Sequence, residues 1–154
     1  MKAKDFMVKD VISVSPEISI KDVMSTFVEK KVGGVPIMKK DGTLCGIVTD
    51  GDILRAIKPM DKQIHDYFSF ITYVAVEDME LHLNELIGRD IIKIAKTHGI
   101  VTVHPEDDMT KVVNLLSKHH FKKLPVVDDQ HHVVGVISRG DVIRNIQQTI
   151  VESV

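Results

Sequence analysis

The sequence predicts a mixed α/β (α+β) fold of two βαββα units packed about a pseudo-twofold axis, with an extra helical connector. Two observations predict it. One stretch of the chain occurs twice at a constant offset of 89 positions, so that Pro36 returns as Pro125 and Gly46 returns as Gly135. Each copy also passes through strand-like and helix-like apolar patterns in the same order. Because half of a 154-residue chain buries too little apolar surface alone, the two copies are expected to share a core.

Each unit opens with a short β-branched run, at residues 11–14 and at residues 100–103. Such a run predicts a strand, and a proline follows each one. A helix is predicted next, because apolar residues recur at helical spacing in both copies. In the first unit Ser19 can cap this helix, and Asp22 stands at the position that completes a capping box.

A β-hairpin is predicted to follow, over residues 35–48 in the first unit and 124–137 in the second. In the first unit Asp41-Gly42 supplies a strong turn signal. The last helix of each unit is then expected to begin near residue 49 or residue 138, which completes the order strand, helix, strand, strand, helix.

Three segments follow from the repeat: unit 1 over residues 1–58, a mostly helical connector over residues 59–95, and unit 2 over residues 96–154. Apolar residues recur at helical spacing in the connector, which favours helices packed on the two units. Two alternatives stay open there. The apolar face could serve self-association, and residues 68–76 could form a strand.

Composition argues against several classes of function. A net charge of −2 gives no electrostatic reason to expect nucleic acid or an anionic membrane, and no apolar run is long enough to span a bilayer. A single cysteine and the lack of an apolar signal core favour a cytoplasmic location. The histidines lack the spacing of a zinc site, so no metal is expected. No nucleophile or phosphate-loop motif appears, so no catalytic residue is assigned.

Two motifs occur in both copies. A Leu/Val-Pro-Val/Ile strand centres on Pro36 and Pro125, and a Gly-x-x-Thr/Ser-x-x-Asp motif ends at Asp52 and Asp141. Together with the opening segment 4–16, they resemble a tandem pair of CBS domains, also called a Bateman module. The resemblance implies a regulatory protein that binds adenosyl ligands such as AMP, ADP, ATP or S-adenosylmethionine in clefts between the units. It also implies frequent dimerisation, and an unknown effector protein controlled in trans.

The repeated Thr/Ser-x-x-Asp motif carries the chemistry that a nucleotide needs. The carboxylates of Asp52 and Asp141 can accept hydrogen bonds from ribose hydroxyls. The hydroxyls of Thr49 and Ser138, beside free N–H groups at a helix start, can hold a phosphate with help from the helix dipole. The resemblance implies the same roles. The alternative is that each motif is only a capping box.

Further candidate ligand residues come from both copies. Hydroxyl groups on the first strands are plausible base contacts, apolar residues can enclose adenine, and the resemblance places the two prolines beside it. Basic residues near the second proline could reach phosphate. These candidates are Ser13, Val35, Pro36, Thr102, Lys122, Lys123, Leu124, Pro125 and Arg139.

The two copies differ near the expected phosphate position. Residues 33–34 are glycines where residues 122–123 are lysines, and Asp50 stands where the second copy has Arg139. Arg139 could add a bidentate phosphate contact, whereas Asp50 would repel phosphate. These differences suggest an asymmetric pair in which the second unit holds the phosphate. The alternative is that the lysines and the arginine form a solvated basic face.

We therefore expect a cytoplasmic, non-enzymatic sensor that forms a homodimer and binds AMP, ADP or ATP between its halves. The ligand would change the relative orientation of the halves through its different affinity for the two states. Other ligands stay open, namely S-adenosylmethionine, NAD or a cyclic dinucleotide. Two other classes also stay open: a ligand-free dimerisation or interaction module, and an enzyme with an unrecognised site.

Overall fold

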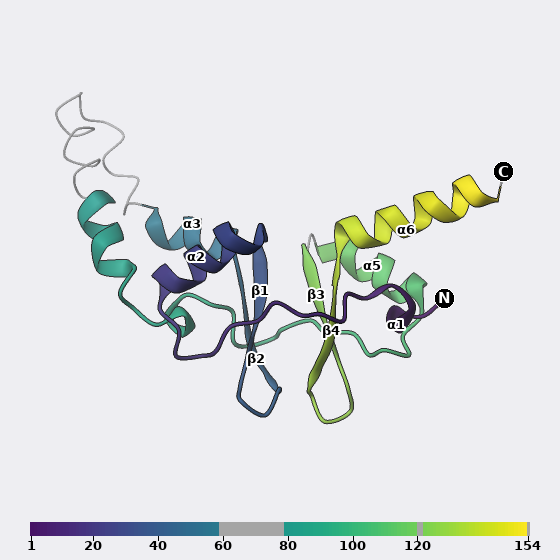
Figure 1. Cartoon of the computed structure of the whole chain (residues 1–154), viewed down its shortest axis with the longest axis horizontal. Helices are drawn as coiled ribbons and strands as arrows, with labels where there is room; N and C mark the ends of the chain where they lie inside the picture. Colours follow the sequence, from purple (N-terminus) through teal and green to yellow (C-terminus); the bar gives the residue numbers. More distant parts are fainter. Residues whose placement is uncertain (59–78, 120–121, 154) are drawn as a thin grey trace.

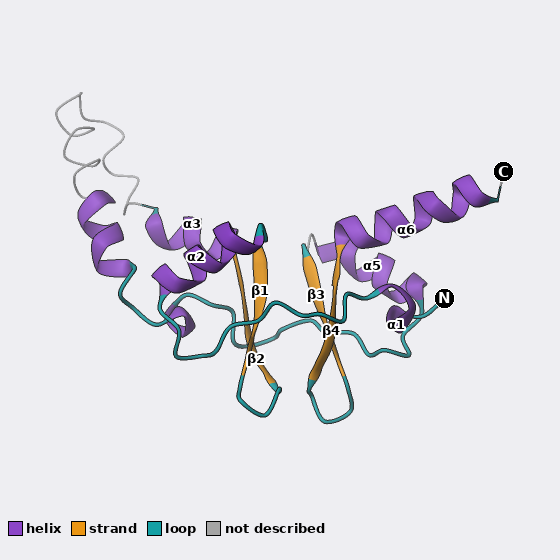
Figure 2. Ribbon diagram, viewed as in Figure 1, coloured by secondary structure: helices purple, strands orange, loops and turns teal. Residues whose placement is uncertain are grey.

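A computed structural model describes residues 1–58, 79–119 and 122–153 and shows two similar halves side by side (Figure 1). The first half contains α2 (Ile20–Lys30), β1 (Gly34–Met38), β2 (Leu44–Thr49) and α3 (Asp50–Ile57). The second half contains α5 (Met109–His119), β3 (Lys123–Val127), β4 (Val133–Ser138) and α6 (Arg139–Glu152). Two short elements are α1 (Ala3–Phe6) and η2 (Ile91–Lys93). The predicted mixed fold of two units about a pseudo-twofold axis is confirmed, with the hairpins central and the helices outside (Figure 2).

The first strand predicted in each unit is wrong in extent. Within the run 11–14, which the structure describes in full, Val14 alone forms a β-bridge. Its N–H donates to the Pro36 carbonyl (3.1 Å), and its carbonyl accepts from the Met38 N–H (2.9 Å). Extending this parallel ladder would need N–H donors at residues 36 and 16, and both are prolines. The equivalent residues of the second half are Val103, Pro125, Val127 and Pro105.

The two predicted hairpins form, and their turns meet. β1 pairs with β2 and β3 pairs with β4, both antiparallel. The turns use left-handed backbone at Gly42 (φ 87°) and at His131 (φ 67°). Between the turns, the Leu44 N–H donates to the His131 carbonyl (3.1 Å), and the Val133 N–H donates to the Gly42 carbonyl (3.0 Å). The halves are therefore joined by backbone bonds at the hairpin tips.

The helix caps largely follow the sequence. Ser19 caps α2, because its Oγ accepts a hydrogen bond from the Asp22 N–H (3.1 Å). Among the hydrogen bonds of the described residues, the return bond of the predicted capping box is missing. Ser19 instead forms an antiparallel bridge with Asp90. α2 ends at Lys30, and the residue that caps it, Lys31, has a left-handed backbone (φ 55°).

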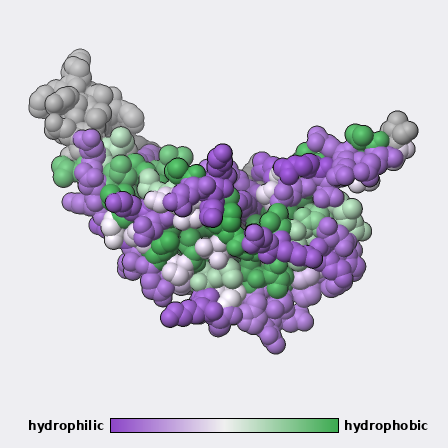
Figure 3. Space-filling model, viewed as in Figure 1, coloured by the Kyte–Doolittle hydropathy of each residue, from purple (hydrophilic) through white to green (hydrophobic). Residues whose placement is uncertain are grey.

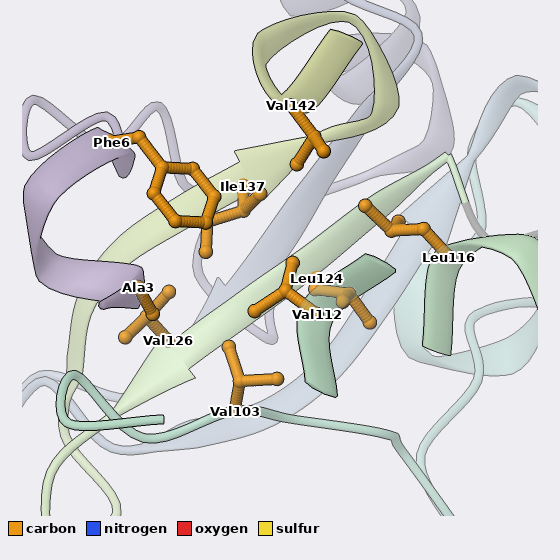
Figure 4. Packing of buried hydrophobic residues seen from close by; sticks show 9 residues of the cluster. All are labelled: Ala3, Phe6, Val103, Val112, Leu116, Leu124, Val126, Ile137 and Val142. Atoms are coloured by element: carbon orange, nitrogen blue, oxygen red, sulfur yellow. The ribbon is translucent and has the colours of Figure 1, made fainter. Parts of the chain in front are cut away.

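The expected single core is wrong, because the buried apolar residues of the described chain form two clusters. Each cluster lies within one half but takes a segment from elsewhere in the chain. Ala3 and Phe6 of α1 complete the core of the second half (Figure 4). Leu86 and Ile91 complete the core of the first half. Half of a short chain therefore reaches a sufficient core by exchanging segments with the other half.

Backbone pairing follows the same exchange. The Val8 N–H donates to the Val136 carbonyl (2.9 Å), so the segment that enters the first half pairs with β4. The Ile47 N–H donates to the Lys96 carbonyl (2.9 Å), so the segment that enters the second half pairs with β2. The N-terminal segment accordingly runs from the second half across the middle to the first (Figure 1).

The predicted division at residues 1–58, 59–95 and 96–154 stays a prediction. Of the connector, residues 59–78, which contain the possible strand at 68–76, lie outside the described residues. Residues 79–86 are helical. Within the described chain, the helices are too short or too polar to cross a membrane.

Candidate ligand clefts between the halves

Both Thr/Ser-x-x-Asp motifs form complete capping boxes at the starts of α3 and α6. The Asp52 N–H donates to Thr49 Oγ1 (3.4 Å), and the Thr49 N–H donates to Asp52 Oδ2 (2.9 Å). In the second half the Asp141 N–H donates to Ser138 Oγ (3.1 Å), and the Ser138 N–H donates to Asp141 Oδ2 (3.1 Å). The capping alternative is thus realised, with one carboxylate oxygen of each aspartate left outside the box.

The remaining oxygens have unequal partners. Asp52 Oδ1 lies 2.7 Å from Arg55 Nη2, whereas Asp141 Oδ1 lies 3.7 Å from Arg144 Nη1. Both carboxylates are largely buried, with side-chain exposures of 16% and 20%. A ribose hydroxyl that bound either Oδ1 would compete with an exposed arginine, and the competition would be weaker at Asp141.

Two clefts lie beside these boxes, and each is built from both halves. Cleft I has a volume of about 300 Å³. The first half supplies the box of α3 and the end of β2, and the second half supplies the extended run and the start of β3. Cleft I is lined by Ile47, Thr49, Asp50, Gly51, Asp52, Arg55, Lys96, Ile100, Val101, Lys122 and Lys123.

Cleft II is related to cleft I by the pseudo-twofold axis and has a volume of about 230 Å³. Here the second half supplies the box of α6, and the first half supplies the extended run and β1. Cleft II is lined by Val8, Asp10, Val11, Ile12, Val32, Gly34, Pro36, Lys123, Val136, Ser138 and Asp141.

Because of this crossing, several residues predicted to bind the ligand lie outside the linings of the two clefts. Val35 and Leu124 were expected to contact adenine, but both are fully buried in the two cores, and neither is among the described residues that line the clefts. Pro125 is also fully buried, whereas Pro36 lines cleft II. Val35 and Leu124 belong to the cores because each packs with buried residues of the helices of its own half.

The predicted base contacts on the first runs lie outside the clefts as described. Ser13 is exposed and Thr102 is half-buried, and the linings of both clefts omit them. Their apolar neighbours face the clefts instead: Val11 and Ile12 line cleft II, and Val101 lines cleft I.

The two lysines take different places: Lys122 lies with the first motif, and Lys123 lines both clefts. Lys122 Nζ lies 3.0 Å from Asp50 Oδ1, and Lys123 Nζ donates to the Gly34 carbonyl (3.0 Å). Arg139 lines an apolar groove between α5 and α6. The start of β3 lies at the boundary between the halves, so its side chains extend into the opposite half.

The glycines of the first copy leave room for these crossing side chains. A Cβ added to Gly33 would lie 3.0 Å from Asp50 Oδ2. A Cβ added to Gly34 would lie 3.3 Å from Thr49 Cγ2 and 3.8 Å from Lys123 Cδ. The tight contacts, to Asp50 and Thr49, lie within the first half, and Lys123 adds an ordinary van der Waals contact from the second half at Gly34.

Lys123 lies between the two clefts and lines both. Burial lowers the pKa of Lys123 below its ordinary value, and the negative charge of Asp141 opposes this shift. Its ammonium group is thus poorly hydrated. An anion bound nearby would replace the hydration that this group has lost.

Sequence reasoning missed three charged residues of the clefts. Arg55 was detectable as a partner three residues beyond Asp52 on a helix. Asp10 and Lys96 carried no local signal, because they belong to segments that cross to the opposite half. Across the described residues, no group of three or more His, Cys, Asp or Glu side chains is arranged to hold a metal ion.

Comparison with known proteins gives a family match over most of the chain. The family model of the CBS domain matches residues 3–59 and again residues 89–148. The uncharacterized protein MJ1426 of Methanocaldococcus jannaschii is 28% identical over 156 residues, which cover 93% of this chain and 89% of that protein. The chloroplastic CBS domain-containing protein CBSX2 of Arabidopsis thaliana is 27% identical over 146 residues; the match spans 91% of this chain and 61% of CBSX2.

Solved structures share the fold. The crystal structure of CBSX2 in complex with AMP matches with a TM-score of 0.73 and 25% identity, covering 96% of this chain and 97% of that chain. The CBS domain pair of protein MJ0100, in complex with 5′-methylthioadenosine and S-adenosyl-L-methionine, matches with a TM-score of 0.70 and 25% identity. That match covers 95% of this chain and 99% of the other.

Proposed function

Since this chain belongs to the CBS domain family and carries the domain twice, we propose that it is a regulatory protein that binds an adenosine-containing nucleotide. AMP, ADP or ATP binds in cleft I and changes the arrangement of the halves, which controls an effector protein in trans. One observation carries this proposal. Cleft I brings together Asp52, Thr49 and Lys122, which can serve the ribose and the phosphate, although they come from different halves.

The chemistry of cleft I fits each part of a nucleotide. Ile47, Ile100 and Val101 supply apolar surface for the adenine ring. Asp52 Oδ1 accepts hydrogen bonds from the ribose hydroxyls once Arg55 moves away. The phosphate lies at the start of α3, where N–H groups and the helix dipole favour an anion. The structure of CBSX2 with AMP supports this ligand class.

Ligand binding changes contacts between the halves. A phosphate in cleft I competes with Asp50 for Lys122, and this ion pair joins the two halves in the present structure. We expect the backbone bonds at the hairpin tips to stay in place, because the turn residues that form them are outside the lining of cleft I. The halves therefore reorient about the tips. A ligand shifts this equilibrium by its differential affinity for the two arrangements.

Thermal unfolding in the presence of nucleotides tests the proposal. AMP, ADP, ATP and S-adenosylmethionine are each added at millimolar concentration, with GMP and inorganic phosphate as matched controls. A true ligand raises stability by about 2.7 kcal/mol at a hundred times its Kd. We expect an adenine nucleotide to raise Tm and the controls to leave it unchanged. Equal Tm shifts with GMP or phosphate would show that cleft I is a non-specific anion site.

The second candidate is a ligand-free dimerisation module, which the complete capping boxes favour. Both motif aspartates are already engaged in helix caps, so a cap alone accounts for them. The absence of any thermal shift with the adenosyl compounds would support this candidate.

We also propose that the protein forms a homodimer. Leu54 and Ile143 occupy equivalent positions on α3 and α6, and their exposures are 68% and 50%. α6 projects beyond the second half, and apolar surface lies near its end (Figure 3). Sedimentation equilibrium is expected to give a dimer for the native chain and a monomer for Leu54→Lys/Ile143→Lys. A native monomer would contradict this proposal.

We propose, finally, that the protein acts in the cytoplasm without catalysing a reaction. Cysteine usage and the absence of a recognised nucleophile motif support this. Incubation with ATP, followed by chromatography, is expected to return ATP unchanged. Release of ADP or AMP would instead support an enzyme with an unrecognised site.

A further inference from the structure

We propose that the two clefts select ligands of different charge. Cleft I takes a nucleoside that bears phosphate, and cleft II takes a nucleoside without phosphate, preferably one with a cationic substituent. This inference rests on the proposed function, namely that the clefts bind nucleosides at all. It adds which chemical class each cleft accepts.

Cleft I is basic. Four basic side chains line it against two carboxylates. One of these carboxylates, Asp50, is exposed by 47% and pairs with Lys122, which is exposed by 63%. A phosphate can replace Asp50 as the partner of Lys122, because the ammonium group is accessible and a phosphate offers more acceptor oxygens. The charged lining residues are Asp50, Asp52, Arg55, Lys96, Lys122 and Lys123.

Cleft II is acidic. Its described lining holds two carboxylates, Asp10 and Asp141, and one basic side chain, Lys123. Lys123 already donates to the Gly34 carbonyl (3.0 Å) from the boundary between the halves. Cleft I has the same number of carboxylates but four basic side chains, so a phosphate in cleft II would meet an excess of negative charge, which is unfavourable. A cationic group would instead gain from both carboxylates.

The difference arises at three pairs of equivalent positions. Lys122 and Lys96 of cleft I correspond to Gly33 and Met7, and Gly99 corresponds to Asp10 of cleft II. The first two pairs remove positive charge from cleft II, and the third adds negative charge. Arg139, which could restore a cation, lines the groove between α5 and α6. The charge difference is thus produced by the crossing of segments.

Calorimetric titration of the full chain with three probes tests the assignment. The probes are AMP, adenosine and amino-adenosine, an analogue whose ribose carries an ammonium group in place of the terminal hydroxyl. We expect AMP and amino-adenosine to bind the same molecule together, each to one site. AMP affinity should fall steeply with added salt, because phosphate contacts are electrostatic, and adenosine affinity should not.

Two exposed variants assign each probe to a cleft. Lys122→Met is expected to lower AMP affinity about tenfold, which is the range of a lost charge-assisted hydrogen bond. Asp10→Asn is expected to lower amino-adenosine affinity by a similar factor while it affects adenosine less. Asp129→Asn is the matched control, since its side chain is exposed by 95% and stands outside both described linings.

Three results would overturn the assignment. Competition of AMP and amino-adenosine for one site would do so. Binding of AMP to two sites with equal affinity would also do so, and in both cases the proposed function would survive. If none of the probes bound, the proposed function itself would fail, and the assignment of clefts with it.

Discussion

Clefts I and II are lined by equivalent segments of the two repeated units, yet one cleft is basic and the other is acidic. The repeated residues that make the two caps are shared, and the residues that line the boundary are not. At Gly34 and Lys123 the reason is geometric. These equivalent positions meet near the pseudo-twofold axis, where the Lys123 ammonium group donates to the Gly34 carbonyl. Two lysines would crowd there and repel each other, which favours a lysine paired with a glycine at these two positions.

The largest expected effect tests the exchange of segments between the halves. Phe6→Ala should lower the free energy of unfolding by about 3 kcal/mol, because Phe6 is buried in the core of the second half. Ile91→Ala should have a similar effect through the first half. Hydrogen exchange should then show loss of protection mainly in β3 and β4 for Phe6→Ala, and mainly in β1 and β2 for Ile91→Ala. The reverse pattern would contradict the exchange.

A second substitution tests the contact between positions 34 and 123 near the axis. Gly34→Lys should lower stability by about 2 kcal/mol, because its Cβ would lie 3.3 Å from Thr49 Cγ2 and its side chain would compete for space with Lys123, whose Nζ donates to the Gly34 carbonyl. The double variant Gly34→Lys/Lys123→Gly removes the repulsion and should recover part of the loss in urea unfolding. If the double variant were less stable than the single one by the full additive amount, the two positions would not be coupled.

Substitutions at the two N-caps separate the structural role of the hydroxyls from their role in ligand binding. Thr49→Ala and Ser138→Ala should each lower the free energy of unfolding by about 1 kcal/mol, because each removes an N-cap acceptor. AMP affinity should fall with Thr49→Ala and stay with Ser138→Ala, as calorimetry would show. Thr49→Ser keeps the cap and serves as the control. Equal loss of AMP affinity in both alanine variants would contradict the proposal that AMP binds in cleft I and not in cleft II.

The smallest effect concerns the acid dependence of the two hairpin turns. Hydrogen bonds from the Thr43 hydroxyl and N–H lower the pKa of Asp41, and the His132 N–H does the same for Asp128. The unfolded chain then binds more protons than the folded chain between the lowered values and 3.8. This stabilisation is present above 3.8 and is lost as the pH falls through the folded values.

Urea unfolding between pH 6 and pH 3 measures this effect (a range of about three units around the carboxyl pKa values). Asp41→Asn and Asp128→Asn should each flatten the acid side of the stability profile slightly, because an amide does not titrate. The exposed Asp129→Asn serves as the control and should keep the native profile. A profile unchanged by both turn variants would show that the turns contribute nothing to acid sensitivity.

Much of the fold was predictable because it depends on residues close together in the chain. The hairpin turn at Gly42 and the helix starts at Thr49 and Ser138 follow from local backbone preference and capping, and the structure confirms them. The first strands were overestimated for a reason also visible in the sequence. Pro16 and Pro36 lack the donors that a longer ladder needs.

The candidate site was harder to predict, because its residues come from different halves. The sequence predicted Thr49 and Asp52 as one pair, because residues three positions apart at the start of a helix lie close together. Lys122 was predicted to serve the second motif, whereas its side chain crosses the axis to Asp50. Val35 and Leu124 were given a ligand role that their burial in the cores does not support.

The sequence by itself determined the two-unit fold, its hairpins and the capped helices, because periodicity, turn residues and caps act over a few positions. Only the tertiary structure decided which run faces which cap, and hence that Lys122 lies beside Asp50 in a basic cleft while Asp10 lies in an acidic one. The physical reason is that side chains meet across the axis through contacts between residues far apart in the chain. A local sequence pattern does not indicate which distant residue a side chain will contact.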